Sequence, residues 1–63
     1  MNADHVIASL VDVEAQLRDL AYEALRRAAD GDSDGEAEER QFSKARRAVA
    51  KAIRDLGGVV EEF

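Results

Sequence analysis

The chain contains no cysteine, no proline and no tryptophan among its 63 residues. The lack of cysteine excludes disulfide bonds, and it fits a reducing compartment. No apolar run approaches the roughly 20 residues that a helix needs to span a bilayer, and the first residues lack the basic patch of a signal peptide. We therefore expect a cytoplasmic protein that does not enter a membrane.

Side chains that carry chemistry are also scarce. The single histidine, His5, lies four residues before Ser9, the spacing of one helical turn. No third group is placed to orient this pair, and none is placed to stabilise an oxyanion. The Glu-x-x-His motif that builds di-metal sites in helical bundles is absent as well. We predict that the protein is not an enzyme and that it holds no cofactor.

Two long stretches carry apolar residues at alternating spacings of three and four, the pattern of coiled-coil helices. Neither glycine nor proline interrupts the chain from Ala3 to Ala29, and good helix formers dominate there. The two helices should pack against each other along these apolar rows. The predicted rows are Val6, Leu10, Val13, Leu17, Leu20 and Ala24 in the first helix, and Phe42, Ala45, Val49, Ala52 and Leu56 in the second.

A short acidic segment with two glycines separates the stretches. Gly31 is placed to be the left-handed residue just past a helix end, and Ser33 and Glu36 have the spacing of a capping box. A connection this short makes the two helices antiparallel neighbours. We predict one all-α domain over residues 1–63, a coiled-coil-like antiparallel hairpin with helices at about 3–29 and 36–56, a turn at 30–35 and a tail at 57–63.

The tail is short and partly apolar. Gly57 and Gly58 should end the second helix. Val59, Val60 and Phe63 continue the apolar spacing beyond it. We therefore expect the tail to fold back over the start of the first helix.

A chain of this size has little core of its own. A single core below roughly 70 to 80 residues rarely supplies more than about 3–5 kcal/mol. With disulfides excluded, a partner chain is the remaining support, and the first helix carries a second apolar strip that one neighbouring helix cannot cover. We predict that two hairpins form a homodimer, a four-helix bundle in which wider apolar faces are normal.

The second strip also has another interpretation. It runs from Ile7 to Leu25 and is interrupted by Glu14 and Arg18. Exposed aromatic and aliphatic residues often mark binding sites for other proteins. The main functional hypothesis is an interaction or regulatory module whose partner-binding residues are Val11, Arg18, Tyr22 and Leu25.

Cationic side chains gather on one face of the second helix. The fourteen acidic and nine basic residues give a formal net charge of −5, which argues against a nucleic-acid backbone as the main partner. Aromatic side chains for base stacking do not alternate with these cations. Because no acid lies between Arg40 and Arg54, a nucleic-acid-binding regulator remains an alternative. The basic face consists of Arg40, Lys44, Arg47, Lys51 and Arg54.

The turn suggests a third function, calcium binding. Asp30, Asp32 and Asp34 followed by Gly35 resemble the first half of an EF-hand loop, and the resemblance implies that the three carboxylates bind calcium. The twelfth position of such a loop holds a bidentate Glu, but here it is Gln41. An acidic, capped turn explains the pattern better, and calcium binding stays an alternative.

Overall fold

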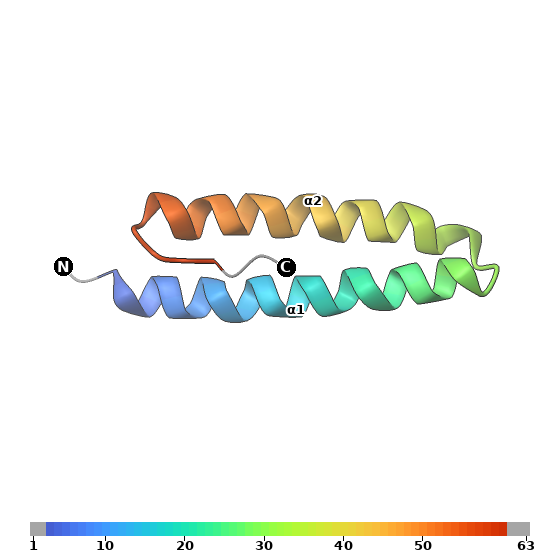
Figure 1. The fold of residues 1–63 in the computed structure, drawn as a ribbon, viewed down its shortest axis with the longest axis horizontal. Coiled ribbons are helices and arrows are strands. Elements are labelled where there is room, and N and C mark those ends of the chain that lie inside the picture. Colours follow the sequence, from blue (N-terminus) through green and yellow to red (C-terminus); the bar gives the residue numbers. More distant parts are fainter. Residues whose placement is uncertain (1–2, 61–63) are drawn as a thin grey trace.

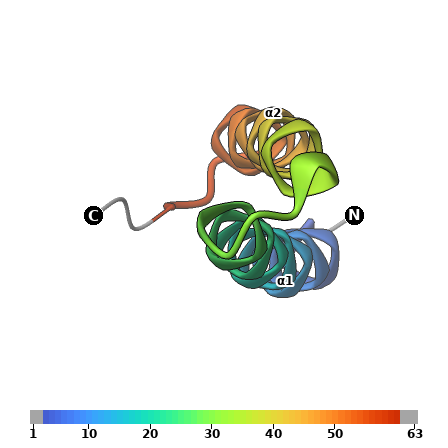
Figure 2. The same ribbon diagram turned by 90° about the vertical axis from the view of Figure 1, so that its right-hand side faces the viewer.

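The computed structural model describes residues 3–60 of the chain. Within them it contains two helices, α1 (Asp4–Ala29) and α2 (Ser33–Asp55), and no strand. The helices lie side by side and antiparallel, and the Cα atoms extend 48 × 19 × 13 Å (Figures 1 and 2). The all-α hairpin predicted from the heptad spacing is confirmed.

The turn between the helices consists of Asp30, Gly31 and Asp32. The Gly31 N–H donates to the Ala28 oxygen at 3.1 Å, and the Asp32 N–H donates to the Arg27 oxygen at 3.0 Å. This is a Schellman motif, which requires a left-handed residue just past the helix. Gly31 has a φ of 97°, so its predicted role is confirmed.

Helix α2 begins at Ser33, earlier than the predicted start near residue 36. Its N-cap is Asp32, whose side-chain Oδ1 accepts a hydrogen bond from the Asp34 N–H at 3.0 Å. The extended backbone of Asp32, with a ψ of 109°, directs the carboxylate at this free N–H group of the first turn. The capping box predicted for Ser33 and Glu36 is wrong, because Asp32 takes the cap position and Ser33 is already helical.

The two helices meet along a face that only partly matches the predicted one. Leu10, Leu17 and Ala24 of the predicted row are half-buried or buried in α1. Val6, Val13 and Leu20 were expected between the helices, but they are 53%, 41% and 43% exposed. Helix α1 instead buries Glu14 and Ala21, the residues that directly follow Val13 and Leu20. The observed seam of α1, its buried and half-buried residues at heptad spacing, consists of Ile7, Leu10, Glu14, Leu17, Ala21, Ala24 and Ala28.

A close approach of the two helix backbones near the turn explains this shift. Gly35 of α2 is buried, and a Cβ atom added there would lie 2.6 Å from the Ala28 nitrogen and 2.7 Å from the Ala24 oxygen. Only glycine fits at such a distance, and the separation of packed helices depends on the side chains at their contact. Heptad counting placed Val6, Val13 and Leu20 in the seam in place of Ile7, Glu14 and Ala21, because it gives no weight to a glycine contact or to a paired acid.

Helix α2 ends in the same way as α1. The Gly57 N–H donates to the Arg54 oxygen at 3.0 Å, and the Gly58 N–H donates to the Ile53 oxygen at 2.9 Å. Gly57 has a φ of 90°, which completes a second Schellman motif. Leu56, predicted to lie in the seam, is the C-cap residue and is 43% exposed.

The tail packs onto the open end of the hairpin. Gly58 has no room for a side chain, because a Cβ atom there would lie 2.8 Å from the Cγ2 atoms of Ile7 and Ile53. Beyond it the chain runs back along the helices (Figure 1), and Val60 is half-buried. The expected fold-back onto the start of α1 is confirmed at Ile7, whereas the part predicted for Phe63 lies outside the described residues.

Candidate interaction surfaces

A buried carboxylate lies in the seam at mid-length. Glu14 of α1 is 4% exposed, and its Oε1 accepts a hydrogen bond from Nη1 of Arg46 in α2 at 3.2 Å. Its Oε2 accepts from Nη2 of Arg18 at 3.3 Å. Two guanidinium groups therefore satisfy both oxygens, as the burial of a charge requires. A polar pair at one seam position specifies the register of packed helices.

Reasoning from the sequence missed this network. Glu14 and Arg18 were treated as interruptions of an apolar strip, and Arg46 had no assigned role. A signal was nevertheless present, because Glu14 stands midway between Ile7 and Ala21 at seven-residue steps. An acid within such an apolar row needs a cation from the facing helix.

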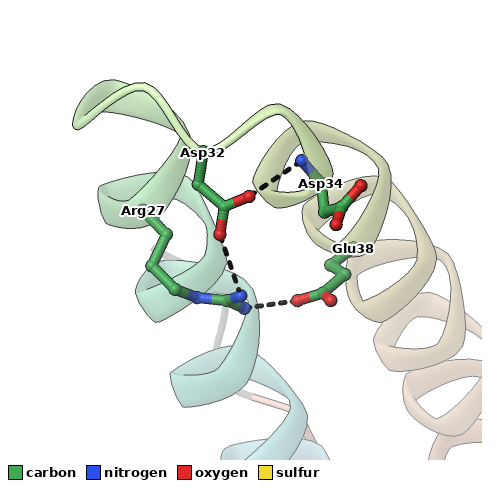
Figure 3. Close-up of polar contacts among 4 residues, drawn as sticks. All are labelled: Arg27, Asp32, Asp34 and Glu38. Atoms are coloured by element: carbon green, nitrogen blue, oxygen red, sulfur yellow. Dashed lines mark hydrogen bonds and ion pairs between the residues drawn. The ribbon is translucent and has the colours of Figure 1, made fainter.

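A second polar cluster joins the turn to α2. Nη1 of Arg27 donates to Oδ2 of Asp32 at 3.5 Å, and Nη2 donates to Oε2 of Glu38 (Figure 3). The hydrogen bond to Glu38 raises the pKa of Arg27, so the guanidinium stays charged. The side chains are 42%, 39% and 39% exposed, so solvent screens these pairs and they orient the turn more than they stabilise the fold.

The ion pair between Arg27 and Glu38 shows which rows of the two helices share one side of the hairpin. Arg27 stands seven residues after Leu20, and Glu38 stands seven residues before Ala45. Residues seven apart lie in one row along a coiled-coil helix, so the two rows run side by side. These rows form what we name the aliphatic side: Val6, Val13, Leu20, Ala45 and Ala52.

The residues predicted to bind another protein flank the seam at its other edge. Val11, Tyr22 and Leu25 are 41%, 66% and 54% exposed in the single chain. The Arg18 side chain is 42% exposed while it reaches Glu14. The structure thus brings these four residues to one side of α1, and binding of a partner there stays a prediction.

Cations of α2 lie on this same side. Arg46, which binds Glu14 beside Arg18, borders a shallow hollow together with Arg40, Lys44 and Arg47. The tail also lies here, because Val60 borders a hollow with Val11, and Figure 2 shows the tail on one side of the helix pair. We name this surface the basic side: Val11, Arg18, Tyr22 and Leu25 of α1 with Arg40, Lys44 and Arg47 of α2.

All five residues of the predicted basic face are exposed on α2. Lys51 is paired with Asp55, at 2.7 Å from Nζ to Oδ2. Arg40, Lys44 and Arg47, in contrast, make no ion pair within residues 3–60. These three cations are the ones available to an anionic partner.

One acid of the turn, Asp32, has a structural role. Its carboxylate caps α2 and contacts Arg27, as Figure 3 shows. Across residues 3–60, no three Asp, Glu or His side chains come together where they could hold a metal ion. Capping explains Asp32, one of the three acids that resemble an EF-hand loop, and calcium binding by Asp30, Asp32 and Asp34 stays a prediction.

Neither helix in the described part of the chain combines the length and apolar character needed to cross a membrane. No protein-family model, no curated protein and no solved structure matches this chain.

Proposed function

We propose that the chain is a small, non-enzymatic protein-interaction module that works as a homodimer. Two hairpins would join through their aliphatic sides into a four-helix bundle. The observation that carries the proposal is the exposure of Val6, Val13 and Leu20 in one row. A row of large aliphatic side chains in water marks an interaction site, and a matching row on a second hairpin buries it.

The surface area of the single chain supports dimerisation. The chain exposes 4861 Å². A folded monomer of its 6.9 kDa mass exposes about 4000 Å². A two-helix hairpin therefore exposes more surface than a compact monomer of the same mass, and a second hairpin can cover part of this surface.

The composition of the aliphatic side also suits a second copy of the chain. Ala45 and Ala52 are half-buried. Because their side chains are small, a second hairpin can approach the α2 half of this side closely. In the two rows that form this side, charge occurs only at the turn end, where Arg27 and Glu38 neutralise each other. No net charge on these rows opposes the contact of two identical surfaces.

The mass of the protein in solution tests this proposal. Light scattering should give twice the chain mass at ~200 µM, and the melting temperature should rise with protein concentration, as expected for a dimer. The double variant Val13→Glu with Leu20→Glu places four carboxylates in the interface and should be monomeric. Ala8→Glu adds a carboxylate at an exposed position outside the aliphatic side and should stay dimeric.

Two results would refute the proposal. One is a wild-type monomer at ~200 µM whose melting temperature does not depend on concentration. The other is a dimer that the double variant leaves intact, because its interface would then lie elsewhere. Circular dichroism on each variant separates loss of the dimer from loss of the helices.

A further inference from the structure

We infer that the basic side binds an acidic amphipathic helix of another protein. The inference names the partner of the interaction module proposed above and rests on that proposal, but it does not require the aliphatic side to be the dimer interface. The basic side combines exposed apolar side chains on α1 with cations on α2 that form no ion pair with any acid in residues 3–60. A helix with one apolar row and carboxylates beside it matches both halves.

The apolar half offers anchors at a helical spacing. Val11 and Leu25 stand fourteen residues apart in one row, about 21 Å along α1, which corresponds to about four turns of a partner helix. Tyr22, one turn before Leu25 and its neighbour on the surface, is 66% exposed. Tyrosine is enriched among the residues that dominate binding energy, because it gives a large contact area and a polar tip.

Within the chain itself, an apolar side chain of the tail packs against the basic side. Val59 and Val60 of the tail border a hollow with Val11, Glu14 and Ile53. Val60 is half-buried there without belonging to either helix. An apolar residue of a partner would make the same kind of contact further along the row, toward Leu25.

The cationic half of the basic side determines that the partner must be acidic. Arg40, Lys44 and Arg47 are exposed and border one hollow. Glu39 borders it too, but its Oε1 already accepts a hydrogen bond from the Ser43 hydroxyl at 2.8 Å. Three cations against one engaged carboxylate leave the hollow positive.

The buried network adds to this positive potential. Glu14 binds both Arg18 and Arg46, so one negative charge stands against two positive charges. The chain as a whole carries a net charge of −5, but charges further away than about 8 Å are screened at physiological ionic strength. Acids also border this side at the turn end, where Leu25 shares a hollow with Glu36 and Tyr22 shares one with Glu23. The positive potential is therefore centred on Arg40, Lys44 and Arg47, and carboxylates of a partner placed there favour its association.

A protein helix fits this surface better than a nucleic acid does. Phosphates would pair with Arg40 and Arg47, but they gain nothing from Val11 and Leu25. Tyr22 is the only aromatic residue of the basic side, so successive bases would find no stacking platform. The apolar half is the observation that selects an amphipathic peptide.

Fluorescence anisotropy with a synthetic peptide tests the inference. The probe is a labelled 18-residue helix with leucines at spacings of three and four and glutamates on both flanks of the leucine row. It should bind saturably to the full chain. A peptide with Gln in place of every Glu should bind at least about tenfold more weakly, because it loses the charge complementarity.

Matched protein variants locate the site. Arg40→Gln with Arg47→Gln should weaken binding about five- to tenfold, and Leu25→Ser should weaken it in the same range. Arg40→Lys with Arg47→Lys keeps both positive charges at the same positions and should bind within about twofold of the wild type. The monomer–dimer balance is measured on the same samples by light scattering.

Three results would overturn the inference: no saturable binding, equal weakening by the Gln and Lys double variants of Arg40 and Arg47, or a single-stranded oligonucleotide of equal charge that binds more tightly than the peptide. The dimer proposal is refuted by a different result, a monomeric mass in light scattering. If the Val13→Glu, Leu20→Glu variant is a folded monomer that still binds the peptide, the partner site is independent of dimerisation.

Discussion

Glu14 of α1 and Arg46 of α2 form an ion pair across the seam, 3.2 Å from Oε1 to Nη1, with the Glu14 residue only 4% exposed. Arg18 binds the other oxygen of the same carboxylate. The pair joins positions thirty-two residues apart in the sequence, so it forms only when the helices pack in this register. Its removal should therefore reveal how much of the fold depends on it.

Removing one member of the pair should destabilise the chain. Arg46→Ala leaves Glu14 buried with Arg18 alone, and we expect the free energy of unfolding to fall by about 1–3 kcal/mol. Replacing both residues, Glu14→Leu with Arg46→Leu, removes the buried charge altogether and should stay within about 1.5 kcal/mol of the wild type. Urea denaturation followed by circular dichroism measures both changes. Equal losses in the single and double variants would contradict this account.

Gly35→Ala should destabilise the hairpin although alanine favours helix. The added Cβ atom would lie under 3 Å from backbone atoms of both Ala24 and Ala28, so the helices must separate. We expect a loss of about 1–3 kcal/mol, as for other overpacked sites.

The exposed Ala37, two residues later in α2, is the control for helix propensity. Ala37→Gly should cost about 0.5–1 kcal/mol through propensity alone. Thermal melts compare the two variants, and a Gly35→Ala protein that melts above the wild type would contradict the close approach.

Asp32→Ala should weaken the start of α2. It removes the cap on the Asp34 N–H and the contact with Arg27, and loss of an N-cap costs about 0.5–2 kcal/mol. Asp32→Asn keeps a capping oxygen and should retain most of the stability. Because the Asp32 carboxylate is engaged by the Asp34 N–H and by Arg27, millimolar calcium should leave the melting temperature of the wild type unchanged. A calcium-dependent rise that is absent from Asp32→Asn would instead support a calcium site.

Gly58→Ala should release the tail from the hairpin. The new Cβ atom would lie 2.8 Å from methyl groups of Ile7 and Ile53, and 3.2 Å from the Ile53 oxygen. The amide of residue 58 donates to the Ile53 oxygen in the wild type. We expect this amide to lose protection in hydrogen exchange while the middle of α2 keeps it, because local opening needs less free energy than global unfolding. Unchanged protection at residue 58 would contradict this packing.

The elements that local rules govern were predictable from the sequence. Uninterrupted helix formers and the glycine at residue 31 are enough to place α1 and the turn, because helix propensity and left-handed caps act within a few residues. The seam was not predictable by the same route. It depends on the backbone contact at Gly35, which brings Ala24 and Ala28 inward and leaves Leu20 partly in water.

The candidate surfaces also include one part that was predictable from the sequence and another part that depends on how the helices pack. The exposure of Tyr22 and Leu25 agrees with a strip that the neighbouring helix cannot cover, whereas the network of Glu14 with Arg46 depends on a register that spacing alone does not give. The cationic hollow also emerges only when Arg46 is seen beside Arg47 and Arg40. Interhelical geometry is the missing information in each of these cases.

The contact at Gly35 also limits how this sequence can diverge. Any side chain at position 35 would collide with the backbone of α1, so homologous chains that keep the hairpin should keep glycine there, with small residues at positions 24 and 28. The rows on the two sides of the hairpin face no such restriction from the fold and are free to vary with whatever they bind. Substitution patterns among relatives would therefore separate the residues that hold the helices together from those selected by a partner.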